Sequence, residues 1–242
     1  MDEPAAPAGR VGRVFAWAGG ALFVVSLLYF VYSYIVRFGF ATAPPAAQGR
    51  TARAWLVDIA MFAVFALHHT LMARTGMKRA LTAYLPPALE RSVYVWVASL
   101  LFLFTCWAWQ PIPGLLYAIP PPWHLAAWAA QAFGVWLTLD AARAMDVLEL
   151  AGIRQVYGRR RPGALKASGS YGIVRHPIYL GWVLITFGIP VMTGTRFAFA
   201  VVSACYLVIA IPFEERTLRG TFGEAYAAYA RRVRWRIVPG LY

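Results

Sequence analysis

The chain has 242 residues, of which 60% are hydrophobic and only 14% charged, and its formal net charge is +13. Soluble domains contain about 25% charged residues, so this composition excludes an ordinary soluble protein and predicts an integral membrane protein. Membrane proteins gather Lys and Arg on cytoplasmic loops, where these side chains also contact anionic lipid headgroups. The positive charge therefore predicts membrane lipids as partners and gives no reason to expect nucleic acid.

Several apolar segments approach the length of about 20 residues that a helix needs to cross the hydrocarbon core. There are six of them, at residues 14–36, 55–72, 93–109, 123–142, 178–192 and 197–213. The fifth is short and continues through Thr193-Gly194-Thr195 into the sixth, which indicates a helical hairpin that either spans the membrane or re-enters it. We therefore expect an all-α integral membrane fold with five to six transmembrane helices and little or no strand.

Loop charges predict the orientation of these helices. If the N-terminus is cytoplasmic, 19 of the 23 Lys and Arg residues fall on the inner side and 4 on the outer side. The connector at residues 110–123 carries no charge and would be external. The positive-inside rule therefore predicts that both termini are cytoplasmic.

Two polar segments flank the last apolar pair. Residues 145–152 are expected to continue the fourth helix beyond the membrane, until Gly152 and the run Arg159-Arg160-Arg161-Pro162-Gly163 end it. We expect this arginine triplet to contact lipid headgroups. Near the C-terminus, residues 221–234 place aromatic and aliphatic side chains at steps of three and four, which predicts an amphipathic surface helix.

The two cysteines, Cys106 and Cys205, both lie inside apolar segments. Neither belongs to a spacing typical of metal ligands, so each is expected to be a small buried apolar residue. We expect no metal site.

Chemistry-bearing residues concentrate in residues 168–181. Pro177 suits the first turn of a helix, where its missing N–H has no helical partner to lose. Arg175 and His176 precede it, where unpaired backbone N–H groups and the positive end of the helix dipole favour an anionic ligand. The adjacent carboxylates Glu214 and Glu215 end the last apolar segment. We expect these two clusters to form one cofactor pocket at the cytoplasmic membrane face.

The pattern Gly169-x-Tyr171-x-x-x-Arg175-His176-Pro177-x-Tyr179-x-Gly181, followed by Glu214-Glu215 and Phe222-Gly223-x-x-Tyr226-x-x-Tyr229, resembles a known superfamily. It is similar to the membrane methyltransferases that include isoprenylcysteine carboxyl methyltransferase and the phospholipid methyltransferases. The resemblance implies S-adenosylmethionine (SAM) as cofactor. It also implies cofactor contacts from these residues: Gly169, Tyr171, Arg175, His176, Pro177, Tyr179, Glu214 and Glu215.

Motifs in the upstream half resemble the bacterial methanethiol S-methyltransferase branch of that superfamily. They are His68-His69, Glu90-Arg91-Ser92-x-Tyr94, Asp146 with Gly152-Ile-Arg-Gln155, and Pro190-x-Met-Thr193. The resemblance implies methyl transfer to a small thiol, giving dimethyl sulfide from methanethiol, in a bacterial inner membrane. The whole chain would be one methyltransferase domain, with transmembrane helices in residues 1–143 and the cofactor-binding core in residues 144–242.

A thiol is mostly protonated near neutral pH, so the reaction needs a base or a positive potential that supplies thiolate. The candidates are His68, His69, Asp140 and Asp146, while Gln155 is expected to close the cofactor pocket. Two alternatives stay open: the same cofactor site acting on a carboxylate, an amine or a lipid headgroup, and a non-catalytic membrane protein. The sequence does not determine the oligomeric state.

Overall fold

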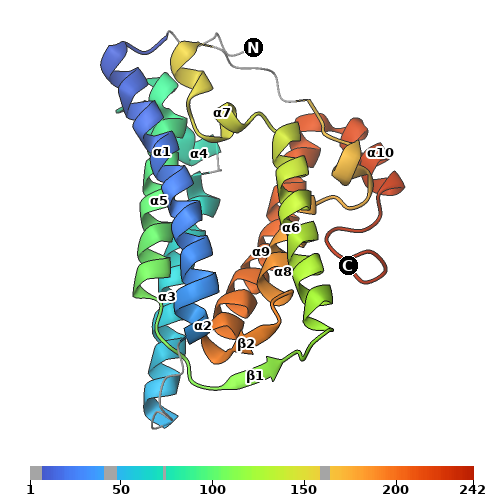
Figure 1. The fold of residues 1–242 in the computed structure, drawn as a ribbon. Coiled ribbons are helices and arrows are strands. Elements are labelled where there is room, and N and C mark those ends of the chain that lie inside the picture. Colours follow the sequence, from blue (N-terminus) through green and yellow to red (C-terminus); the bar gives the residue numbers. More distant parts are fainter. Residues whose placement is uncertain (1–6, 41–47, 73–74, 159–163) are drawn as a thin grey trace. The chain divides into compact units, whose positions relative to one another are not determined.

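The structure is a computed structural model that describes residues 7–40, 48–72, 75–158 and 164–242. It is mostly helical, with two short strands (Figure 1). The longer helices are α1 (Arg10–Tyr32), α3 (Gln48–Met72), α5 (Glu90–Ala108), α6 (His124–Ala144), α8 (Pro177–Phe187) and α9 (Gly194–Phe222). The shorter elements are α2 (Phe38–Phe40), α4 (Thr75–Thr82), α7 (Val147–Leu150), α10 (Glu224–Arg232), β1 (Leu115–Ala118) and β2 (Val191–Thr193).

Each of the six predicted apolar segments contains a helix, but the predicted count of five to six transmembrane helices is not confirmed. Among the described residues, four helical segments are long and apolar enough to cross a membrane: Arg10–Arg37, Thr51–Met72, Pro87–Ala108 and Gly194–Phe222. Helix α6 has 21 residues but is not apolar enough to be counted with them. Helix α8 has 11 residues and so is about 16 Å long, which is roughly half of the hydrocarbon core.

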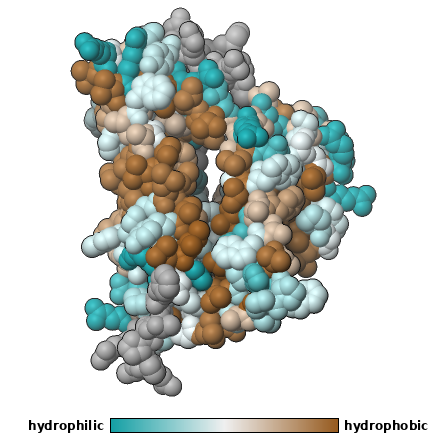
Figure 2. Space-filling view, viewed as in Figure 1, coloured by the Kyte–Doolittle hydropathy of each residue, from teal (hydrophilic) through white to brown (hydrophobic). Residues whose placement is uncertain are grey.

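The described chain divides into two compact units. The first contains α1 to α5 and the segment from Asp146 to Gly158, and the second contains residues 112–145 and 164–242. In the first unit, α1 and α3 both pack on α5. Helices α1 and α5 approach closely where Gly19 of α1 lies against Trp96 of α5. Small residues at such contacts are common between membrane helices. Figure 2 shows apolar side chains exposed over the middle of this unit, as lipid contact requires.

In the second unit, α6 packs along α8 and α8 contacts α9. Gly181 of α8 packs tightly against α6, since a Cβ added there would lie 2.7 Å from the carbonyl oxygen of Gly134 and still nearer to Thr138 Oγ1. Strands β1 and β2 form an antiparallel pair, with Ala118 opposite Val191. The fifth and sixth segments form two helices in contact, α8 and α9, and the short link between them contains β2.

Two other expectations need correction. Helix α6 does not continue through residues 145–152: it ends at Ala144, and Asp146 starts the separate helix α7 by accepting hydrogen bonds from the N–H groups of Leu148 and Glu149. Cys106 is buried as predicted, but Cys205 is exposed on α9, so that it adds to the apolar surface of a candidate span. The arginine triplet at 159–161 lies outside the described residues.

The predicted C-terminal amphipathic helix is confirmed as α10. Tyr226, Tyr229 and Val233 form a buried cluster on one face of it, packed against Leu218 and Phe222 of α9 among other residues. Arg231 and Arg232 are exposed, as the predicted periodicity requires. This packing anchors the chain that follows α10 beside α9.

Candidate functional site

The start of α8 positions the central histidine. His176 is the N-cap residue of this helix and Pro177 its first residue. Because a residue before proline is kept out of the helical conformation, His176 adopts φ −124° and ψ 67° instead. Its side chain is 4% exposed and stacks on the ring of Tyr179, with the ring centroids 5.2 Å apart.

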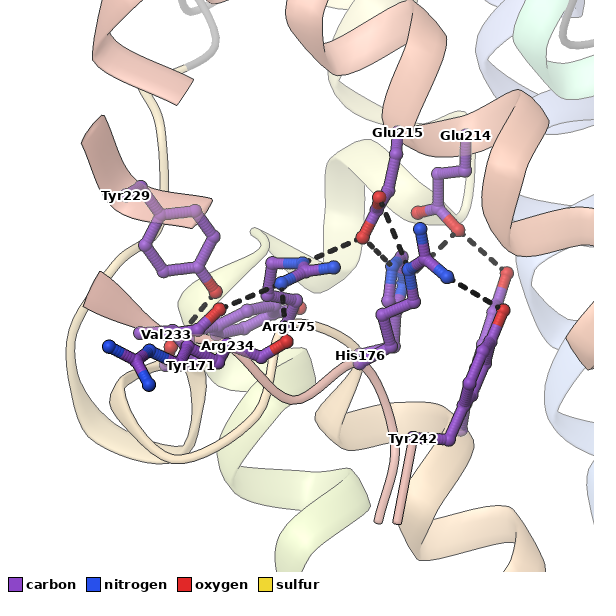
Figure 3. Close-up of polar contacts among 11 residues, drawn as sticks. Tyr171, Arg175, His176, Glu214, Glu215, Tyr229, Val233, Arg234 and Tyr242 are labelled. Atoms are coloured by element: carbon purple, nitrogen blue, oxygen red, sulfur yellow. Dashed lines mark hydrogen bonds and ion pairs between the residues drawn. The ribbon is translucent and has the colours of Figure 1, made fainter. Parts of the chain in front are cut away.

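Helix α9 continues for two turns beyond its apolar part and so carries both glutamates inside a helix. Adjacent helical residues point about 100° apart, yet both carboxylates reach the same imidazole. His176 Nδ1 lies 3.5 Å from Glu214 Oε2, and His176 Nε2 lies 3.4 Å from Glu215 Oε1. Figure 3 shows the two glutamates on either side of this ring. The predicted meeting of these two clusters is therefore present.

The two glutamates differ in their surroundings. Glu215 is buried, and its Oε1 also accepts a hydrogen bond from Arg175 Nε at 2.7 Å, while Arg236 Nε lies 3.5 Å from its Oε2. Glu214 is exposed and accepts a hydrogen bond from the Tyr179 hydroxyl at 2.8 Å. Burial lowers the pKa of His176, but the hydrogen bonds and charges of the two glutamates outweigh burial, so its net pKa is raised above 6.5. The site therefore favours a protonated imidazole between two carboxylates.

The C-terminal tail, residues 233–242, contacts this site, although the motifs include none of its residues. The backbone N–H groups of Arg175 and His176 donate to the carbonyls of Trp235 and Arg236 at 2.9 and 2.8 Å. Arg175 Nη1 donates to the carbonyls of Val233 and Arg234, both at 2.8 Å (Figure 3). The signal in the sequence was the basic and aromatic run from Arg234 to Arg236, but irregular backbone has no periodicity by which to place it.

A short turn at Gly169–Gly172 lies before this network. Gly169 has a positive φ of 63°, which glycine adopts without the strain of a side chain. The N–H of Ser170 donates to Asp140 Oδ2 at 3.3 Å, and the Tyr229 hydroxyl donates to the carbonyl of Tyr171 at 2.9 Å. Burial, together with the Glu214 charge and the neighbouring Tyr229, raises the pKa of the Tyr171 hydroxyl to about 12. Tyr171 is therefore a neutral group near physiological pH.

The predicted histidines form a separate cluster in the first unit. His69 Nδ1 lies 2.6 Å from the hydroxyl of Tyr94, and the His68 ring stacks on the Tyr94 ring with centroids 5.6 Å apart. The Arg91 guanidinium lies 4.5 Å from the centre of the same ring. His68, His69 and Arg91 therefore all contact the side chain of Tyr94.

Asp146 and Gln155 also belong to the first unit and have local partners. Asp146 forms an ion pair with Arg154 besides capping α7. Gln155 Nε2 donates to the carbonyl of Glu149 at 3.3 Å. No group of three or more His, Cys, Asp or Glu side chains that could hold a metal ion occurs within the described parts of the chain.

A pocket of about 210 Å³ opens beside Glu215 in the second unit. It is lined by Pro212, Glu215, Arg216, Arg219 and Arg236. Pockets for drug-sized ligands measure about 300–1,000 Å³, so this one accommodates only part of such a molecule. Three arginines and one glutamate border it, so the positive charge around the pocket exceeds the negative charge.

Comparisons with known proteins agree with the resemblance that the motifs indicate. Residues 123–225 match the model of a family described as phospholipid methyltransferase. The methanethiol S-methyltransferase of Mycobacterium tuberculosis is 34% identical over 229 residues, which cover 86% of this chain and 94% of that protein. Methanethiol S-methyltransferase 2 of Bradyrhizobium diazoefficiens is 36% identical over 245 residues, covering 95% and 90%.

A third relative, the methanethiol S-methyltransferase of a Pseudomonas strain, is 30% identical over 94% of both chains. No solved structure matches the chain significantly. The matched family region includes the turn, α8 and Glu214 with Glu215, and the relatives extend the similarity over nearly the whole chain. The chain therefore belongs to the phospholipid methyltransferase family, together with these methanethiol S-methyltransferases.

Proposed function

We propose that this protein is a membrane enzyme that transfers a methyl group from SAM to the sulfur of a small thiol, converting methanethiol to dimethyl sulfide. One observation carries the proposal. The relatives from Mycobacterium tuberculosis and Bradyrhizobium diazoefficiens, which are named methanethiol S-methyltransferases, match this chain over 94% and 90% of their own length. The network around His176 supports it, since Tyr179, Glu214 and Glu215, which the resemblance also assigns to the cofactor, take part in it.

The donor set around His176 fits the chemistry of SAM. This cofactor has an amino-acid end with a carboxylate and an ammonium group, a ribose with two hydroxyls, and an adenine ring. The second unit offers guanidinium groups for the carboxylate, the exposed carboxylate of Glu214 for a hydroxyl or ammonium group, and the rings of Tyr171 and Tyr179 for packing. When bound, SAM supplies an electrophilic methyl group on a sulfonium centre.

Arg175 has a different role in our proposal from the one its motif suggests. Its Nε binds Glu215, its Nη1 binds two carbonyls of the tail, and its side chain is 8% exposed. A guanidinium with these partners is suited to hold the tail and Glu215 in place. We therefore propose that Arg175 and Gly169 position the site, and that His176, Tyr171, Tyr179 and Glu214 face the cofactor.

The candidates for the base that supplies the thiolate fall in both units. Methyl transfer from a sulfonium to a thiolate neutralises charge, so a water-poor site favours it, but a proton must first leave the thiol. Asp146 is engaged as a helix cap and ion-pair partner, and Asp140 accepts the N–H of Ser170. His68 and His69 lie beside Tyr94 in the first unit, and we keep both as candidates for the proton acceptor because imidazole is a common general base.

The test is headspace gas chromatography of membranes containing the protein, supplied with SAM and methanethiol. We expect dimethyl sulfide to form, and we expect Glu214→Ala and His176→Ala to lower its rate at least tenfold. Arg231→Gln, which changes an exposed arginine of α10, is the matched control and should keep the wild-type rate. Parallel assays with a prenylcysteine and with phosphatidylethanolamine test the carboxylate and amine alternatives. No product with any acceptor, together with no SAM binding at millimolar concentration, would refute the proposal.

A further inference from the structure

The pocket beside Glu215 contains more positive charge than its one carboxylate can balance. Arg216, Arg219 and Arg236 line it with Glu215. Glu215 is already paired with Arg175 and lies close to His176. The unbalanced charge therefore belongs to the arginines that line the pocket, and an anionic group of a ligand would balance it.

Among these three arginines, Arg236 is the one held in a fixed position. Its Nη1 donates to the Tyr242 hydroxyl at 3.1 Å, its Nε lies 3.5 Å from Glu215 Oε2, and its Cζ lies 5.1 Å from the centre of the Tyr242 ring. The tail supports this arrangement because the N–H of Arg236 donates to the carbonyl of Tyr242 at 2.9 Å. Arg236 Nη2 has no hydrogen-bond partner within the described part of the chain, and a third of the side chain is exposed.

Arg216 and Arg219 contrast with Arg236. Both are exposed on the outer turns of α9, and among the described residues neither side chain makes a hydrogen bond or an ion pair. A flexible cation loses side-chain entropy when it binds, whereas a guanidinium already held by neighbours loses less. This difference in entropy cost favours Arg236 as the residue that binds an anionic group directly. Arg216 and Arg219 then add to the positive potential of the pocket.

We propose that Arg236 binds the carboxylate of the amino-acid end of SAM, with Glu215 and Tyr242 as the groups that position its guanidinium. This inference rests on the proposed function and adds a residue that the motifs do not include. The pocket is too small for the whole cofactor but accommodates an amino-acid end, whose carboxylate a planar guanidinium binds through paired hydrogen bonds.

The experiment measures equilibrium binding of SAM and of decarboxylated SAM to the purified protein in detergent. The second compound keeps the sulfonium and the adenosine and lacks only the carboxylate. We expect wild-type protein to prefer SAM by about 10- to 100-fold, the range for one hydrogen bond to a charged group. Arg236→Gln should reduce this preference to less than about threefold by weakening SAM binding while leaving the analogue's affinity nearly unchanged. Arg231→Gln should keep the wild-type preference.

The two affinities distinguish a contact from a merely structural role. If Arg236 only holds the tail, Arg236→Gln weakens both ligands equally and the preference persists, which overturns the inference while the proposed function stands. If wild-type protein binds neither compound, the proposed function itself fails. Arg236→Lys is a second variant, for use if the glutamine variant does not fold. It keeps the charge but loses the planar fork, so its preference should fall between those of wild type and the glutamine variant, and an unchanged preference contradicts the assignment.

Discussion

The strongest stability prediction concerns the buried carboxylate of Glu215. The variant Glu215→Gln keeps the size of the side chain but removes the negative charge that faces Arg175, His176 and Arg236. The Arg175 side chain is 8% exposed and so cannot regain full hydration. Removing one member of a buried ion pair costs about 3–5 kcal/mol, and we expect a loss of stability in this range.

The adjacent glutamate provides the matched control. The Glu214 side chain is 46% exposed, and pairs of exposed charges contribute at most about 1 kcal/mol. In a chain of this length 1 kcal/mol corresponds to about 2–4 °C, so Glu215→Gln should lower the unfolding midpoint by about 6–20 °C and Glu214→Gln by no more than about 4 °C.

Thermal unfolding of the purified proteins in detergent, followed by circular dichroism without cofactor, measures both variants. Limited proteolysis adds an independent readout, because Glu215 holds Arg175, which in turn binds the tail carbonyls of Val233 and Arg234. The Glu215 variant should lose its tail to protease earlier than the wild-type protein does. Equal midpoints for the two variants would show that the buried network contributes no more stability than an exposed pair, contrary to our reasoning.

Two further predictions test the histidine and the glycine contact. The two glutamates raise the folded-state pKa of His176 above 6.5, so its contribution to stability is complete below pH 6.5 and is lost as pH rises through the folded-state pKa. We therefore expect the unfolding midpoint of His176→Asn, measured from pH 5.5 to 9, to lack the alkaline decline that this group causes. A decline identical to that of the wild-type protein would contradict the assignment. Gly181→Ala should destabilise the protein by about 1–3 kcal/mol because its Cβ would meet Thr138 Oγ1 and the carbonyl oxygen of Gly134. Gly220→Ala is the control, since no atom lies within 4 Å of its added Cβ; it should leave the thermal midpoint unchanged or raise it, because alanine favours a helix.

Part of the fold followed from local sequence alone. The six apolar segments all contain helices, and the aromatic positions of α10 form the buried face that their spacing predicts. Hydrophobic periodicity is a local property, so no knowledge of partners was needed. The same information predicted the wrong end for α6, because Asp146 binds two nearby N–H groups and starts a new helix, and it could not separate a spanning helix from the short α8.

The candidate site divides in the same way. Residue types and motif spacing were sufficient to select Arg175, His176, Tyr179, Glu214 and Glu215, and the structure brings these side chains into one network. Sequence alone could not rank them. The two neighbouring glutamates differ in burial: Glu215 is buried beside Arg175 and Arg236, whereas Glu214 is exposed.

The sequence by itself determined the membrane class, the helical segments and the motif residues, because hydropathy and motif spacing are written along the chain. Tertiary structure decided the rest: that Arg175 has internal partners, and that the tail from Val233 to Tyr242 brings Arg236 to the pocket beside Glu215. These contacts join residues up to about sixty positions apart through irregular backbone. Their energies depend on burial and on which charges meet, and neither quantity exists until the chain has folded.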